Sequence, residues 1–264
     1  MTAKSKHFAS EAEMCAAFVS EIGPDWTSYA ETAGWDILLV RNADGFQIGV
    51  EAKLRLNAQV LTQALERSHE GFGPDCRAVL VPNGAGGGLE TIAQHCGLTV
   101  LRIHSHENYR GTKTVGFFPA LPRSAEGSLW GGDWHESCPT KRCPLPDYVP
   151  DVVPGRPAPV QLTNWKIAAL KVTALIELTG LVTRADFKAL GMDARRWITP
   201  GYDWLRPEGG AFVAGDRMPN FSEQHPDVYA KVKADAPVWL PKVRPNAYPE
   251  LFTSPAAAPA QAAE

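Results

Sequence analysis

The sequence lacks the features that mark several specialised classes of protein. None of its apolar runs approaches the roughly 18 residues that a membrane-spanning helix requires. Its five cysteines are odd in number and scattered, unlike the even pattern of a disulfide framework. The stretch from Met1 to Glu13 is charged and has no apolar signal region. We therefore expect a cytoplasmic protein with no membrane partner.

An excess of positive charge is also missing. The formal net charge is −3, from 26 Lys and Arg against 29 Asp and Glu, so the chain is not a polycation that coats nucleic acid. This balance does not exclude DNA, because local patches rather than totals determine phosphate binding. With 264 residues and 44% hydrophobic residues, the chain is long and apolar enough for one large domain or two modest ones.

Composition divides the chain into four parts. Residues 1–118 alternate apolar runs with turn signals, which predicts a folded domain. Residues 119–160 are rich in Pro and Gly and predict a linker or an irregular extension. A helical pattern returns in residues 161–250, and the Ala- and Pro-rich residues 251–264 predict a disordered tail.

The first part predicts a mixed β-sheet flanked by helices. Ser10 and Glu13 form a capping-box pattern at the start of a helix that ends at Gly23. The tetrapeptide at 42–45, Asn-Ala-Asp-Gly, is typical of a hairpin. The expected strands are Trp35–Arg41, Phe46–Leu54, Arg77–Val81 and Leu98–Ile103, and the further helices are Ala58–Ser68 and Leu89–His95. This order places the fold in the α/β class.

The hairpin brings three ionisable groups together. If Arg41 pairs with Phe46, the numbers of paired residues sum to 87, and Asp36 lies opposite Glu51. A two-residue turn would instead place Asp36 opposite Lys53. Cross-strand neighbours lie about 5 Å apart, close enough for two carboxylates to share a Mg²⁺ or Mn²⁺ ion. The alternative is an exposed salt-bridge cluster with a structural role.

These residues resemble the PD-(D/E)XK nuclease superfamily, whose fold is the restriction-endonuclease-like fold. The matching segments are Gly34-Trp35-Asp36 and Val50-Glu51-Ala52-Lys53, within residues 8–105. Trp35 replaces the proline for which the superfamily is named. The resemblance implies that Asp36, Glu51 and the carbonyl of Ala52 hold a metal, and that Lys53 orients or helps to activate the attacking water.

The resemblance also assigns roles to three residues on helices. Glu13 matches an acid that many members place on the first helix, although it could equally be a capping residue. Gln59 and Gln63 are four residues apart, so they share one helix face, and they match substrate-binding polar residues that some members have beside the active site. The alternative for this pair is an ordinary solvated face.

Two other patterns are weaker. His135, Cys138 and Cys143 are spaced loosely like metal ligands, but a closed zinc site needs a fourth ligand, so free thiols in a loop are preferred. The glycine-rich segment at 83–88 lacks the Lys-Ser/Thr ending of a phosphate-binding loop, and a flexible connection is preferred.

The third part predicts a small, mostly helical module. Asn164 and Thr183 are expected to cap successive helices, and residues 191–193 form a turn before a further helix. This outline resembles a helix-turn-helix or winged-helix module. Arg195 and Arg196 begin its last helix, where they could contact DNA. A protein-binding role is the alternative.

Together these patterns predict a Mg²⁺-dependent nuclease, a hydrolase that cleaves phosphodiester bonds in DNA. The alternative from another class is a protein that keeps the nuclease fold without turnover and serves as a DNA-binding or regulatory component. The sequence leaves endo- against exonuclease cleavage, DNA against RNA and the oligomeric state open, a homodimer included.

Overall fold

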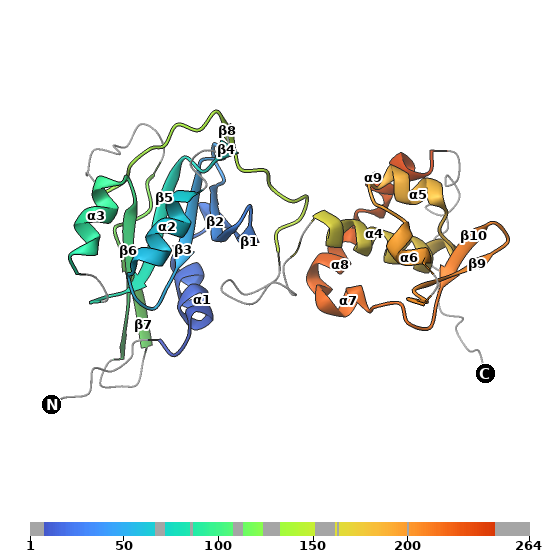
Figure 1. The fold of residues 1–264 in the computed structure, drawn as a ribbon, viewed down its shortest axis with the longest axis horizontal. Helices are drawn as coiled ribbons and strands as arrows, with labels where there is room; N and C mark the ends of the chain where they lie inside the picture. Colours follow the sequence, from blue (N-terminus) through green and yellow to red (C-terminus); the bar gives the residue numbers. More distant parts are fainter. Residues whose placement is uncertain are drawn as a thin grey trace, which may run out of the picture. The chain divides into compact units, whose positions relative to one another are not determined.

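The computed structural model describes residues 8–66, 72–84, 87–107, 113–123, 133–150, 162, 164–199 and 201–245. The chain divides into two compact units, Met1–Leu162 and Thr163–Glu264 (Figure 1). None of the described helices has the length and apolarity of a transmembrane segment. The predicted tail at 251–264 lies outside the described residues.

The first unit is built on a six-stranded mixed sheet with the order β1-β2-β3-β5-β6-β7. Strands β3, β5 and β6 run parallel to one another, while the pairs β1–β2, β2–β3 and β6–β7 are antiparallel. The strands are β1 (Trp26–Thr32), β2 (Trp35–Arg41), β3 (Gln47–Ala52), β5 (Cys76–Pro82), β6 (Thr99–Glu107) and β7 (Lys113–Phe118). The predicted α/β class with a mixed sheet is confirmed.

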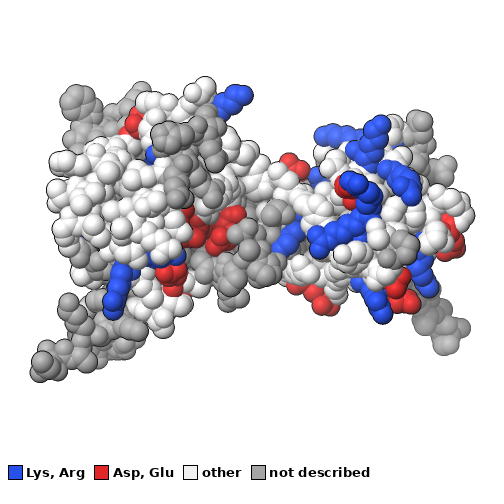
Figure 2. Space-filling view, viewed as in Figure 1, with Lys and Arg blue, Asp and Glu red and all other residues white. Residues whose placement is uncertain are grey.

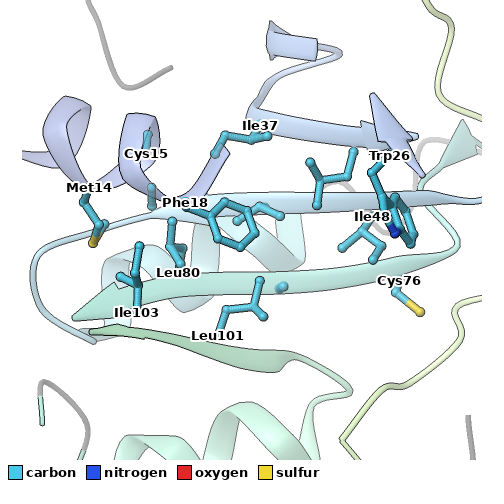
Figure 3. Packing of buried hydrophobic residues seen from close by; sticks show 14 of the residues in the cluster. Met14, Cys15, Phe18, Trp26, Ile37, Ile48, Cys76, Leu80, Leu101 and Ile103 are labelled. Atoms are coloured by element: carbon cyan, nitrogen blue, oxygen red, sulfur yellow. The ribbon is translucent and has the colours of Figure 1, made fainter. Parts of the chain in front are cut away.

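Helices cover both faces of this sheet. On one face, α1 (Glu11–Glu21) inserts Met14, Cys15 and Phe18 against apolar residues of the central strands (Figure 3). On the other face, α2 (Ala58–Glu66) and α3 (Leu89–His95) contribute a second apolar cluster that includes Val60 and Ala93. Burial of apolar surface on both faces explains why the central strands read as nearly continuous apolar runs.

Most of the predicted elements of this unit are present, and four strands are additional: β1, β7 and the short strands β4 (Phe72–Gly73) and β8 (Lys141–Arg142). Helix α3 has the predicted bounds, while β5 and β6 extend the predicted runs. A third strand beside the hairpin was left open by the sequence, and β1 was not located, because its sequence WTSYAET mixes polar and apolar residues and a positive φ occurs at Glu31 and Ala33, near its end. Strand β7 was not predicted either. Residues 67 and 68 of the predicted second helix lie outside the described residues.

The described part of the Pro- and Gly-rich segment packs on the sheet. Short strand β8 (Lys141–Arg142) pairs in parallel with β4 (Phe72–Gly73). The side-chain amide of Gln47 accepts from the Cys143 N–H at 2.8 Å and donates to the Cys143 carbonyl at 3.0 Å. Asp75 accepts from the Gln47 N–H at 2.7 Å and pairs with Arg142 at 2.8 Å. Residues 133–150 are therefore an irregular extension of the first unit.

The second unit consists of helices and one hairpin. Its helices are α4 (Asn164–Thr179), α5 (Arg184–Ala189), α6 (Arg195–Ile198), α7 (Phe221–Gln224), α8 (Pro226–Ala234) and α9 (Ala236–Val243). Strands β9 (Leu205–Glu208) and β10 (Ala211–Ala214) form the hairpin, and Val182 bridges to Phe212. The predicted succession of helix, short helix, turn and helix is present, and α6 is a single turn.

An aromatic cluster forms the core beneath α6. Trp197 is fully buried, and its ring contacts those of Trp165, Phe187, Trp204 and Phe221 at centroid distances of 5.4 to 6.2 Å. Aromatic pairs at such distances contribute about 0.5–1.5 kcal/mol each beyond the area that they bury. The cluster fixes α6 against α4 and the hairpin.

Candidate functional site

The hairpin between β2 and β3 has the first of the two predicted registers. Ile37 pairs with Val50 and Val40 pairs with Gln47, so the numbers of paired residues sum to 87. Arg41 also donates its N–H to the Phe46 carbonyl at 2.8 Å. Continuing the ladder by one residue places Asp36 opposite Glu51.

Asp36 is held at the start of β2 by the neighbouring strand. Its Oδ2 accepts the N–H of Ala52 at 2.8 Å. Burial raises the pKa of the Asp36 carboxyl above its ordinary value, although the Ala52 hydrogen bond and the nearby Lys53 ammonium lower it. Glu11 raises the same pKa further. Asp36 is therefore a carboxylate whose charge is only partly compensated.

The residue before Asp36 explains a glycine in β3. A Cβ atom at Gly49 would lie 2.4 Å from two ring atoms of Trp35, far closer than non-bonded atoms approach. The Trp35 indole, which is almost fully buried, therefore lies directly on the β3 backbone. Two residues further along β3, Glu51 is also buried, with 7% of its surface exposed.

Lys53 lies among three carboxylates. Its Nζ is 3.0 Å from Glu11 Oε2, in a pair whose side chains are 28% and 34% exposed. Burial lowers the pKa of Lys53, but Glu11, Asp36 and Glu51 together raise it above its ordinary value. Lys53 is thus a protonated ammonium at neutral pH. One ammonium among three carboxylates leaves this part of the sheet rich in negative charge.

The first helix contributes an acid that was not predicted. Glu13 donates its N–H to Ser10 Oγ at 3.1 Å, so Ser10 caps the helix, while the Glu13 carboxylate accepts the N–H of Ala9, one residue before the N-cap, at 2.7 Å, so the full capping box is not formed. The acid that the structure brings to Lys53 is Glu11. A signal for it exists in the sequence, because Glu11 is four residues before the buried Cys15 and so lies on the sheet-facing stripe of α1.

The two glutamines of α2 differ in their surroundings. Helix α2 packs against β3 and β5. Gln59 is exposed, whereas Gln63 is partly buried, and its Oε1 has no hydrogen-bond partner among the described residues. A buried acceptor without a partner is costly, so Gln63 is the better candidate of the two for binding a ligand.

The cluster offers a metal ion oxygen donors alone. Within the described ranges, no group of three or more His, Cys, Asp or Glu side chains could hold a metal. The predicted set has two carboxylates, Asp36 and Glu51, and the carbonyl of Ala52. Hard oxygen donors with surplus negative charge suit Mg²⁺ or Mn²⁺, which also keep several water ligands. The chemistry of these residues therefore fits such an ion.

The other predicted ligands and contacts lie elsewhere. Cys138 is an exposed free thiol and Cys143 a buried one. In the second unit, Arg195 is 85% exposed in its side chain and pairs with Asp193 at 2.7 Å. The Arg196 guanidinium lies over the Trp165 and Trp204 rings at 5.5 and 5.3 Å.

The fold and the site define a mixed α/β protein with an acid–acid–lysine cluster on the central hairpin of its sheet. No protein-family model, curated protein sequence or solved structure matches the chain. Membership of the PD-(D/E)XK superfamily therefore stays a prediction that depends on the motif residues and their placement.

Proposed function

We propose that the first unit is a metal-dependent nuclease of the restriction-endonuclease-like fold that hydrolyses phosphodiester bonds in DNA. The observation that carries this proposal is the register of the β2–β3 hairpin. Extended by one residue beyond the Ile37–Val50 pair, this register sets Asp36 opposite Glu51, and both carboxylates raise the pKa of Lys53. An exposed structural salt-bridge cluster would not require Glu51 to be buried and Asp36 to be partly buried, since removal of carboxylates from water is unfavourable.

In this proposal the carboxylates hold the cation. Asp36 and Glu51, with the carbonyl of Ala52, would bind one Mg²⁺ or Mn²⁺ ion. When bound, such an ion polarises a phosphate and lowers the pKa of a water molecule. The Ala52 N–H, which donates to Asp36 Oδ2, fixes the orientation of that carboxylate before any ligand arrives.

Lys53 would act on the developing charge. Its ammonium keeps its proton because three carboxylates raise its pKa, so it can place a positive charge beside the phosphate oxygens in the transition state. Glu11, at 3.0 Å from Lys53, would position this ammonium. Gln63 would offer its unpartnered Oε1 to the substrate or to a water molecule.

The test is a cleavage assay with purified protein. Circular single-stranded, circular duplex and linear duplex DNA and a structured RNA are incubated with Mg²⁺, Mn²⁺ or EDTA. Cleavage that requires metal, disappears in D36N and K53M, and persists in the exposed-residue control D25N supports the proposal. Cleavage that is equal in EDTA, or that survives both site variants, contradicts it. The pattern of substrates separates endonuclease from exonuclease activity.

A second candidate is a nuclease-like protein without turnover that binds DNA or regulates a partner. It is favoured by the absence of a three-residue metal group within the described ranges and by the engagement of Lys53 with Glu11. It predicts no cleavage of any substrate, together with DNA binding that the K53M substitution leaves unchanged in a gel-shift assay.

A further inference from the structure

The second unit carries a cluster of exposed cations on α5, the following turn and α6, which we call the basic face. Between residues 184 and 196 the exposed cations are Arg184, Lys188, Arg195 and Arg196, and one acid, Asp193, is exposed beside them. Figure 2 shows Lys and Arg side chains gathered over this part of the unit. This concentration contrasts with the whole chain, whose net charge is −3.

Aromatic rings and one ion pair orient the three arginines of the basic face; Arg195 pairs with Asp193 at 2.7 Å. Arg196 lies over the rings of Trp165 and Trp204, and Arg184 lies over Phe212 of β10 at 5.7 Å. Stacking on a ring engages the face of a guanidinium and leaves the N–H groups at its edge available to a phosphate. Arg184 and Arg196 are thus held with their donor edges available to a phosphate.

The elements beneath the basic face are rigidly joined. Thr183 and Asp186 form a capping box at the start of α5. Asp186, with 2% of its side chain exposed, binds Arg244 through two contacts of 2.6 and 2.7 Å. Phe187 of α5 packs on Trp197 of α6. The two helices are therefore held in one arrangement, so the cations that they carry act as one surface.

The short length of α6 limits what the basic face can recognise. A helix that reads base edges enters the major groove, but α6 has four residues and its Trp197 is fully buried. Single strands are bound by stacking bases on successive exposed rings. Here the rings of Trp165, Trp204 and Phe212 lie under guanidinium groups. Tyr202, with 52% of its surface exposed, is the only strongly exposed ring in the described part of this unit.

We infer that the basic face binds the phosphate backbone of duplex DNA without reading its base sequence. The choice of DNA as the polymer rests on the proposed function. The duplex is bound through the charges of the basic face alone. Neutralisation of Z phosphates gives a slope of about −0.9Z in a plot of log affinity against log salt, so four cations predict a slope of about −3.6.

The test measures binding of the full chain in EDTA, which keeps binding separate from cleavage. Fluorescence anisotropy is recorded with duplexes of unrelated sequence and with single strands, at several salt concentrations. We expect affinities that agree within about twofold among the duplexes. The double variant R184A/K188A should bind on the order of tenfold more weakly at low salt, with a slope that is less steep by about 1.8.

Three controls make the result specific to the basic face. The variants K231A and K242A remove exposed cations of α8 and α9 and should bind as the natural protein does. The charge-preserving variant R184K/K188R should restore the affinity, and Y202A should leave it unchanged. Equal losses in the α8 and α9 variants, a strong preference for one duplex sequence, or tighter binding of single strands that Y202A abolishes would overturn the inference.

The outcomes also separate this inference from the proposed nuclease activity. Duplex binding that depends on Arg184 and Lys188, without cleavage in the presence of Mg²⁺ or Mn²⁺, would support the inference and contradict the proposed function. Metal-dependent cleavage together with binding that is unaffected by R184A/K188A would support the proposed function and contradict this inference.

Discussion

Asp36 combines partial burial, a hydrogen bond from the Ala52 N–H and a raised pKa. A carboxyl whose folded-state pKa is raised stabilises the fold at low pH, and this contribution is lost as the pH rises from its unfolded pKa through the raised value. At neutral pH the ionised group is therefore destabilising unless a cation compensates it. Residues that hold a ligand often carry this kind of penalty.

We predict that D36N is more thermostable than the natural protein at neutral pH in EDTA, since Asn is neutral and its Oδ1 can still accept the Ala52 N–H. Saturating Mg²⁺ or Mn²⁺ should raise the melting temperature of the natural protein on the order of 5–10 °C, as expected for a ligand near one hundred times its Kd, and should leave D36N unchanged. Differential scanning fluorimetry gives both values. An equal metal effect in D36N would contradict a metal site at Asp36.

The contact of Trp35 with Gly49 gives a second prediction for single residues. G49A should destabilise the first unit by about 1–3 kcal/mol, because the added methyl group would overlap the indole and force one strand to shift. It should also reduce any cleavage, since Trp35 adjoins Asp36. The matched control is G88A, where an added Cβ would meet no atom within 4 Å. Urea denaturation measures the free energy of unfolding of both variants, and equal losses in G49A and G88A would show that the contact of Trp35 with Gly49 is unimportant.

Among the elements, α1 and β3 are linked by the ion pair of Glu11 and Lys53. We predict that E11Q shifts the alkaline limb of the pH profile for cleavage to lower pH. Glu11 raises the pKa of Lys53, so its loss lets the ammonium deprotonate at lower pH. The control E21Q, on the same helix, should leave the profile unchanged. E13A should lower stability by about 1 kcal/mol through the lost hydrogen bond to the Ala9 N–H without moving this limb.

The elements that could be predicted from the sequence are those with local signals. The 42–45 turn and the alternation of β3 narrowed the hairpin to two registers, both of which bring Asp36, Glu51 and Lys53 together, and the structure has the one whose paired residue numbers sum to 87. Glu11 was not predicted, because its contact with Lys53 joins residues 42 positions apart and the capping pattern drew attention to Glu13. Strand β1 was not predicted since its pairing with β2, and not its own composition, makes it a strand. The same holds for residues 133–150, which pack through side-chain to main-chain hydrogen bonds that no periodic pattern indicates.

At the scale of the whole molecule, the two units have separate cores, so we expect two unfolding transitions. We predict that R244M lowers the free energy of unfolding of the second unit by about 3–5 kcal/mol, because it leaves Asp186 buried without its cation. The unfolding temperature of the first unit, which is the one that should respond to metal, should not change. The control R217M removes a partner of Asp203 in a pair that is mostly exposed, and it should have little effect. Calorimetry resolves the two transitions, and a joint shift in R244M would contradict their independence.

Acid should weaken the second unit through the same pair. The Arg244 guanidinium and the Thr183 hydrogen bonds outweigh burial and hold the pKa of Asp186 below its ordinary value. A depressed carboxyl pKa contributes stability that is fully present above its unfolded value, near 4, and is lost as the pH falls through the lower folded value. In R244M this part of the acid sensitivity should disappear, which a melting series from pH 7 to pH 2 would reveal.

The hydrogen bonds between Gln47 and Cys143 also constrain when the candidate site can form during synthesis. Gln47 begins the strand that carries Glu51 and leads to Lys53, yet the main chain that satisfies its side-chain amide lies 96 residues later. A nascent chain that has reached only the composition change near residue 120 would leave this amide without its partner and the first strand pairings less stable. The ribosome must therefore deliver more than half of the chain before β3 is secured. Any hydrolytic activity would be delayed until that point.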